Sequence, residues 1–279
     1  MNIKDLITRA GAGITYILFV LIGVLGGKYS FLVVFGIILA LGLYEFYRMV
    51  EKDTEHYISK VFNIVSGLVI YVSAFFFMEG LNVYFFSATI LIYLLILFTS
   101  GICIKRHDIL HSIINSAFGQ LYITLPMCLL MLIGYQYNLF NDDFHHALIL
   151  AIFVMIWVND TAAYFFGTLI GKHRFVEHIS PKKTTEGLIA GLFFTIIAGL
   201  IFAHFYPQYP IGFWIGFAAI ASVFGTVGDL FESLIKRTYK IKDSGHLLPG
   251  HGGILDRIDS LLIEIPAIFF YLMTFTIFA

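Results

Sequence analysis

The sequence carries little charge for its length, and this scarcity excludes whole classes of protein. Of 279 residues, 13% are Asp, Glu, Lys or Arg, whereas 59% are hydrophobic. A soluble domain has about 25% charged residues, so the chain lacks the polar surface of a soluble enzyme or a disordered protein. The mean hydropathy of +0.89 agrees with this reading. The composition therefore predicts an integral membrane protein.

Cysteine and excess positive charge are also scarce. The two cysteines, Cys103 and Cys128, lie in or at the edge of apolar runs. Two thiols can form neither a disulfide framework nor a four-ligand zinc site, which excludes a secreted disulfide scaffold. The formal net charge is −1, so the chain has no basic excess for nucleic acid, and we expect no nucleic-acid partner.

Long apolar runs take the place of the missing charge. A transmembrane helix needs about 20 predominantly apolar residues, and nine runs meet this need. They lie near residues 12–27, 31–47, 61–78, 83–104, 117–134, 147–170, 187–206, 211–228 and 259–278. Lys4 and Arg9 before the first run are also typical of a signal peptide, but a second run follows Lys28 so closely that we expect a retained span. The predicted fold class is all-α: a polytopic membrane protein with about nine transmembrane helices.

The positions of Lys and Arg give the orientation, because cytoplasmic loops carry an excess of both. With a cytoplasmic N-terminus, every Lys and Arg except Lys28 falls on the cytoplasmic side. We therefore predict that the N-terminus is inside and the C-terminus outside, in a bacterial-type inner membrane. Residues 1–134 are generic membrane sequence, whereas residues 135–279 form the predicted catalytic region, with cytoplasmic loops 171–186 and 229–260.

The second of these loops holds an unusual set of polar residues. Asp229 and Glu232 are three residues apart and so share a helix face, which Lys236 continues. Asp256 and Asp259 form a second pair with the same spacing. Hard cations such as Mg²⁺ bind one or two carboxylates together with substrate phosphates, so the pattern favours a site for a metal and a polyphosphate. The alternative is a solvated loop with charges at helix ends.

Glycines and further charges surround these acidic pairs. Pro249, Gly250, Gly252 and Gly253 allow a tight turn close to a ligand, and His251 lies inside that turn.

The first loop and the span before it add a second group of polar residues. Lys182 and Lys183 precede a span, where adjacent lysines are often only topology signals. Asp160 and Tyr164 lie one turn apart inside a predicted span, and a carboxylate at membrane depth usually serves function. Glu45 and Glu264 are weaker candidates, and Glu45 could pair with Arg48.

Taken together, these segments resemble one enzyme family. The main run reads Ser233-x-x-Lys236-Arg237-x4-Lys242-Asp243-Ser244-Gly245-x-x-Leu248-Pro249-Gly250-His251-Gly252-Gly253-x-x-Asp256-Arg257-x-Asp259-Ser260. It is similar to the signature of the phosphatidate cytidylyltransferase family, also called CDP-diacylglycerol synthase. The runs Ser180-Pro181-Lys182-Lys183-Thr184-x-Glu186-Gly187 and Asp160-Thr161-x-Ala163-Tyr164-x-x-Gly167 resemble that family too.

The resemblance implies a homodimeric enzyme that converts CTP and phosphatidate to CDP-diacylglycerol and pyrophosphate with Mg²⁺. It implies that Asp229 and Asp256 are metal ligands, with Asp259 beside them. The residues expected to be catalytic are Lys182, Lys183, Lys236, Arg237, Lys242, Asp243, His251 and Arg257. The residues expected to bind substrate are Asp160, Tyr164, Ser180, Glu186, Ser244, Gly252 and Gly253.

The chemistry of the reaction agrees with this constellation. An anionic phosphate oxygen attacks the α-phosphorus of CTP, so the main obstacle is repulsion between polyanions, which metal ions and cations relieve. A CTP-dependent lipid kinase attacking the γ-phosphorus, or a cytidylyltransferase for another lipid phosphate, would use the same residues. A transporter is a third alternative, but the polar residues crowd at one membrane face instead of the midplane.

Overall fold

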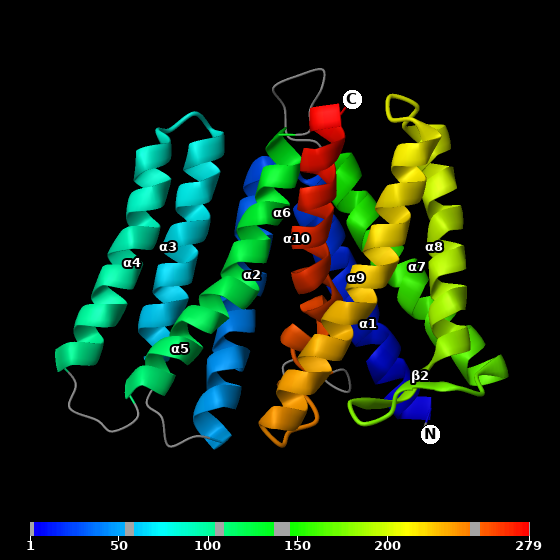
Figure 1. Cartoon of the computed structure of the whole chain (residues 1–279), viewed down its shortest axis with the longest axis horizontal. Helices are drawn as coiled ribbons and strands as arrows, with labels where there is room; N and C mark the ends of the chain where they lie inside the picture. Colours follow the sequence, from blue (N-terminus) through cyan, green and yellow to red (C-terminus); the bar gives the residue numbers. More distant parts are fainter. Residues whose placement is uncertain (1–2, 54–58, 104–108, 137–145, 246–251, 279) are drawn as a thin grey trace. The chain divides into compact units, whose positions relative to one another are not determined.

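The computed structural model describes residues 3–53, 59–103, 109–136, 146–245 and 252–278. Within these ranges the chain is almost entirely helical, with one short hairpin (Figure 1). The helices are α1 (Ile3–Leu25), α2 (Lys28–Asp53), α3 (Lys60–Met78), α4 (Val83–Cys103), α5 (Ile109–Gly119), the π-helical turn η1 (Gln120–Thr124), α6 (Leu125–Gln136), α7 (His146–Ile170), α8 (Thr185–Phe205), α9 (Ile211–Thr238) and α10 (Leu255–Phe278).

Across the described ranges, eight helical segments are long and apolar enough to cross a membrane. They run from α2 to α10, and α5, η1 and α6 together make one of them, Ile109–Tyr135. The apolar part of α1, Gly13–Leu25, is shorter. The prediction of a polytopic, α-helical integral membrane protein is therefore confirmed, whereas the ninth span and the orientation stay predictions.

Helix α9 is longer than its apolar run. The run ends at Gly228, yet the helix continues to Thr238, because the intervening residues include neither Gly nor Pro. A Glu232–Lys236 ion pair one turn apart supports this extension. The predicted loop 229–260 is therefore wrong over its first part and its last residues: it is helical to Thr238 and again from Leu255.

The predicted loop 171–186 also has regular structure. It contains β1 (Arg174–Val176) and β2 (Ser180–Thr184), which pair antiparallel with Arg174 opposite Thr184 and Val176 opposite Ser180. The hairpin connects the end of α7 to the start of α8 (Figure 1). The all-α prediction missed it because its strands are short and mostly polar, without the alternation that marks a half-buried strand.

The chain forms two compact units. The first comprises Met1–His146 and Tyr239–Arg257, and the second comprises Ala147–Thr238 and Ile258–Ala279. The segment Tyr239–Arg257 thus packs with the N-terminal helices, although we grouped it by function with the C-terminal region. The functional division at residue 134 stays a prediction.

A buried polar network holds the first unit together around η1. The Gln120 side chain donates to the Asn63 backbone oxygen at 2.7 Å and accepts from the Thr124 hydroxyl at 2.7 Å. Asn63 also donates to the Ser116 hydroxyl at 3.1 Å, and the Tyr47 hydroxyl donates to the Ser116 backbone oxygen at 2.8 Å. These bonds connect α2, α3, α5 and η1.

In the second unit, small residues let α7, α8 and α9 approach closely. An added Cβ at Gly191 of α8 would lie 2.6 Å from Asn159 Oδ1 of α7, which is closer than real contacts allow. The same Asn159 oxygen accepts a hydrogen bond from Ser222 of α9 at 2.6 Å. An added Cβ at Gly187 would likewise lie 2.6 Å from the Ala163 backbone oxygen. Close helix contact thus fixes the position of the α7 segment that carries Asp160.

Candidate functional site

Acidic side chains from three helices gather in the second unit. Asp259 of α10 lies within electrostatic range of Asp229 and Glu232 of α9 and of Asp160 of α7. Glu232 is completely buried, whereas Asp160 is exposed and Asp229 and Asp259 are half-buried. The structure therefore brings the predicted ligands Asp229 and Asp259 into one acidic cluster with the intramembrane Asp160.

A lysine from the hairpin contacts this acidic cluster. The Lys183 ammonium of β2 lies 2.5 Å from Asp229 Oδ2, with 27% and 32% of the two side chains exposed. Lysine 183 was predicted from its place in a polar run, and Asp229 from its spacing to Glu232. The sequence placed them in different loops and gave no sign that they meet. Lys236 pairs with Glu232 in the same cluster.

The rest of the hairpin is held by the start of α8. Thr184 is the N-cap of α8, and its hydroxyl accepts from the Gly187 N–H at 3.2 Å. Glu186 accepts from the backbone N–H groups of Lys172 and His173 at 3.1 Å and 3.2 Å, and its side chain lies 2.6 Å from His173 Nδ1. Glu186, predicted to bind substrate, thus holds the hairpin on which Lys183 lies.

In the first unit, the start of α10 is built around Asp256. Asp256 Oδ2 accepts from the Gly253 N–H at 2.7 Å, from the Ser244 N–H at 3.0 Å and from the Ser244 hydroxyl at 2.9 Å. Gly252 has a φ of 82°, in the left-handed region that favours glycine. The predicted metal ligand Asp256 therefore also holds Ser244 and Gly253 in place. Since the Gly253 N–H is engaged by Asp256, the expected role of Gly253 in binding substrate stays a prediction.

Glu45 is the residue whose importance the sequence understated. It is 2% exposed on α2, and Oε2 accepts from the Leu255 N–H at 2.8 Å. The Ser244 hydroxyl lies 3.3 Å from the same oxygen. The expected pairing with Arg48 is therefore wrong: the partners lie about 200 residues later in the chain, beyond the reach of helical spacing.

Glu264, the other weak candidate, is completely buried on α10 in the second unit. Neither carboxylate oxygen has a hydrogen-bond partner among the described residues. An added Cβ at Gly225 of α9 would lie 3.0 Å from Glu264 Oε2, and Asp160 is its electrostatic neighbour.

The remaining predicted residues divide by exposure. The exposed residues are Asp160, Tyr164, Lys182, Arg237, Lys242 and Asp243. The half-buried residues are Ser180, Lys183, Glu186, Asp229, Lys236, Gly252, Asp256, Arg257 and Asp259. Ser244 and Gly253 are buried. His251 lies outside the described residues. Lys236 and Arg237 occupy the last turn of α9, where cations also suit the helix dipole.

The donor chemistry suits Mg²⁺ only in part. In the described segments, no group of three or more His, Cys, Asp or Glu side chains is arranged to hold a metal ion. Mg²⁺, however, usually takes one or two carboxylates and completes its octahedral shell with waters and substrate phosphates. Asp229 and Asp259, as hard oxygen donors in an acidic cluster, fit that requirement.

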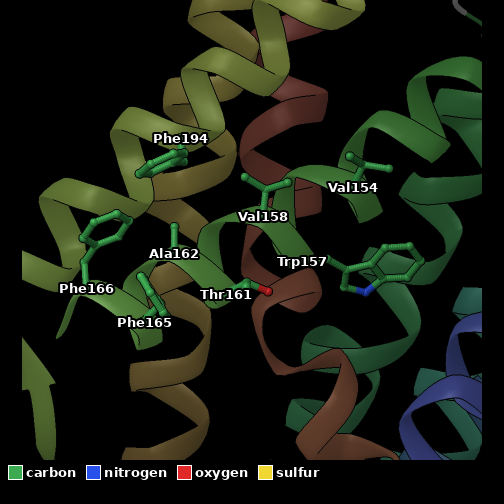
Figure 2. Close-up of a pocket in the computed structure, with 8 residues that line it drawn as sticks. All are labelled: Val154, Trp157, Val158, Thr161, Ala162, Phe165, Phe166 and Phe194. Carbon is green, nitrogen blue, oxygen red and sulfur yellow. The ribbon is translucent and has the colours of Figure 1, made fainter. Parts of the chain in front are cut away.

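An apolar groove lies on the same helix as Asp160. It has a volume of about 440 Å³ and opens between α7 and α8 in the second unit (Figure 2). Its lining is almost wholly aromatic and aliphatic: Val154, Trp157, Val158, Thr161, Ala162, Phe165, Phe166 and Phe194. Trp157 and Thr161 flank Asp160 along α7, so apolar and acidic surfaces adjoin.

Comparison with known proteins gives consistent matches. The model of the cytidylyltransferase family matches residues 7–275. A phosphatidate cytidylyltransferase of Staphylococcus aureus (strain COL) is 46% identical over 132 residues, 47% of this chain and 50% of the relative. The proteins of the same name from Staphylococcus haemolyticus and Bacillus subtilis (strain 168) are 44% identical over 134 residues and 45% identical over 125, covering 50% and 46% of those relatives. The chain spans about half the length of the curated relatives that it matches.

Proposed function

Because this chain belongs to the cytidylyltransferase family, we propose that it transfers the cytidylyl group of CTP to phosphatidate, giving CDP-diacylglycerol and pyrophosphate. The curated relatives bear the name of this activity. An integral membrane fold suits it as well, because one substrate is a lipid and the other is a soluble polyanion.

One observation in the structure carries the proposal furthest: the ammonium of Lys183 lies against Asp229 within an acidic cluster. The acids attract a cation, and the lysine can neutralise an anion. A reaction between two polyanions needs both a bound cation and a positively charged side chain. Without substrate, Lys183 neutralises Asp229; when phosphates arrive, the same ammonium can turn to them.

The reaction is an in-line displacement at the α-phosphorus of CTP. An oxygen of the phosphatidate phosphate forms the new P–O bond, and the bond to pyrophosphate breaks. The attacking oxygen is already anionic near neutral pH, so the protein needs no strong general base. Its task is to hold the two phosphates in line and to offset their mutual repulsion.

The residues of this chain divide that work. Lys182 and Lys183 on β2 would neutralise phosphate of CTP or of the lipid headgroup. Lys236 and Arg237 on the last turn of α9, and Lys242 beyond it, would hold the remaining phosphate charge. Mg²⁺ would supply further charge neutralisation at the phosphates. Asp229 and Asp259 would hold it, and Asp256 stays a predicted ligand. The apolar groove on α7 would accommodate part of the lipid.

The decisive experiment measures products. Purified protein in detergent, given CTP labelled in the cytosine and phosphatidate, should release pyrophosphate and form a labelled lipid in a Mg²⁺-dependent way. A CTP-dependent lipid kinase would instead release CDP and leave the label in water. Release of CDP would therefore refute the proposal. The proposal would also be refuted if the protein did not turn over phosphatidate but did turn over an isoprenoid phosphate.

The orientation and assembly belong to the same proposal. The distribution of Lys and Arg supports an active site that faces the cytoplasm. A cysteine introduced near Pro249 should react with an impermeant thiol reagent only after the inner face is opened, whereas one near Asn141 should react in intact cells. The reverse labelling would overturn the orientation. A homodimer should appear as a cross-linked pair of chains in native membranes.

A further inference from the structure

The carboxylate of Glu45 caps the start of α10. The first four N–H groups of a helix lack partners within the helix. One of them, the Leu255 N–H, donates to Glu45 Oε2 at 2.8 Å. Caps normally come from the residue just before the helix, but this one comes from α2. An oxygen acceptor at a helix N-terminus also suits the positive end of the helix dipole.

Gly245 and Gly253, on the two sides of the Glu45 carboxylate oxygens, leave room for that carboxylate. An added Cβ at Gly245 would collide with Glu45 Oε1, and one at Gly253 would collide with Glu45 Oε2. Neither glycine has a positive φ, so left-handed backbone does not account for them. Close approach of the carboxylate does, which gives a physical reason for two glycines of the sequence motif.

Ser244 connects this cap to Asp256. Its hydroxyl lies 2.9 Å from Asp256 Oδ2 and 3.3 Å from Glu45 Oε2. A hydroxyl has one proton and donates to one acceptor at a time, so the shorter contact with Asp256 is the main bond. Glu45 thus holds Leu255 directly and contacts Ser244, and Ser244 and Gly253 hold Asp256.

We propose that Glu45 is a positioning residue for cytidylyl transfer: from α2 it fixes Ser244, Gly253 and the first residues of α10, and through them the Asp256 carboxylate. The inference rests on the proposed function. Glu45 touches no substrate in this scheme. Its effect on the reaction is geometric, because a displacement of about 1 Å at a reacting group can cost about 10²-fold in rate.

The test combines kinetics with amide hydrogen exchange on the full chain in detergent. In Glu45→Ala, kcat for pyrophosphate release should fall about 10²-fold, the KM for CTP should stay within about threefold, and amides 253–257 should exchange faster. Glu45→Gln keeps an oxygen that can accept from the Leu255 N–H, so its kcat should remain within about tenfold of wild type. The control is Glu51→Gln on the same helix, which removes only a half-exposed pair with Lys60.

A double variant tests the contact itself. Gly245→Ala alone should lower kcat, because its Cβ collides with Glu45. Gly245→Ala combined with Glu45→Ala should be no slower than Glu45→Ala alone, since the obstacle is gone. This comparison stays informative if Gly245→Ala alone folds poorly, because the double variant should then be more stable than Gly245→Ala.

Three results would overturn the positioning role. They are a Glu45→Ala kcat within threefold of wild type, a loss of kcat with unchanged exchange at amides 253–257, or equal losses in Glu45→Gln and Glu45→Ala. Failure of the proposed function gives a different result. Wild type would then form no CDP-lipid, while the exchange difference between wild type and Glu45→Ala would remain and would still show whether Glu45 holds residues 253–257.

Discussion

Replacement of either member of the Lys183–Asp229 pair should separate its structural role from its chemical role. At the 2.5 Å that separates the charged atoms, an effective dielectric constant of about 20 gives a gross attraction of about 7 kcal/mol. The side chains are 27% and 32% exposed, so solvent screening and desolvation cancel most of it. A net coupling of about 1–2 kcal/mol remains, between the values for surface pairs and for charge-assisted hydrogen bonds.

The expected stability changes follow from that coupling. Lys183→Gln leaves the Asp229 carboxylate without its ammonium among other acids, so the free energy of unfolding should fall by about 1–2 kcal/mol. For a protein of this size, that lowers the Tm by about 2–8 °C. The double variant Lys183→Gln with Asp229→Asn removes both charges and should recover most of the loss. Thermal unfolding in detergent measures all of these changes.

Turnover should behave differently from stability. If both residues act on the reacting phosphates or their cation, each single variant loses turnover by at least an order of magnitude, and the double variant recovers none of it. Pyrophosphate release at saturating CTP and phosphatidate provides the measurement. Recovery of turnover in the double variant, or turnover within threefold of wild type in Lys183→Gln, would show that the pair is only structural.

Three further predictions address other parts of the molecule. Asp229→Asn and Asp256→Asn should each lower pyrophosphate release by about 10²–10³-fold or more, and a chelator should abolish wild-type release; activity unaffected by chelation would remove the metal from the scheme. Ala162→Phe should narrow the groove on α7 and raise the KM for long-chain phosphatidate more than for a short-chain analogue, whereas an unchanged ratio would exclude the groove as a tail site. Hydrogen bonds from Lys28 and Tyr135 lower the pKa of Glu79. The ionised Glu79 should therefore add a small stabilisation to the folded protein at neutral pH, which is lost as pH falls through that lowered pKa. The Tm difference between wild type and Glu79→Gln should accordingly vanish in acid.

Hydropathy located the membrane segments well because lipid imposes a simple requirement on backbone polarity and length. Hydropathy did not predict the helix ends where polar residues continue a helix. The run ending at Gly228 gave no indication that α9 reaches Thr238, and the span predicted from residue 117 begins at Ile109. Ser112 and Ser116 interrupt the apolar pattern there, yet both are buried inside the protein.

The candidate residues were found by spacing, but their partners were not. Spacing of three or four residues reveals neighbours on one helix, such as Glu232 and Lys236. It cannot reveal that Lys183 meets Asp229 or that Glu45 meets Leu255, because those contacts depend on how distant segments fold together. The sequence signal for Glu45 was an acidic residue near the end of an apolar run.

The polar network around η1 has a consequence for how the membrane part of the first unit assembles. Apolar helices gain little by choosing each other over lipid, because lipid tails are as apolar as leucine. Hydrogen bonds between Gln120, Asn63 and Thr124 are directional, so they set the rotation and the depth of each helix, which apolar packing leaves poorly determined. During insertion, Asn63 and Gln120 would reach the hydrocarbon region before their partners are in place. The helices that carry them should therefore associate early, as one unit, and a substitution that removes one amide should slow assembly more than it weakens the finished protein.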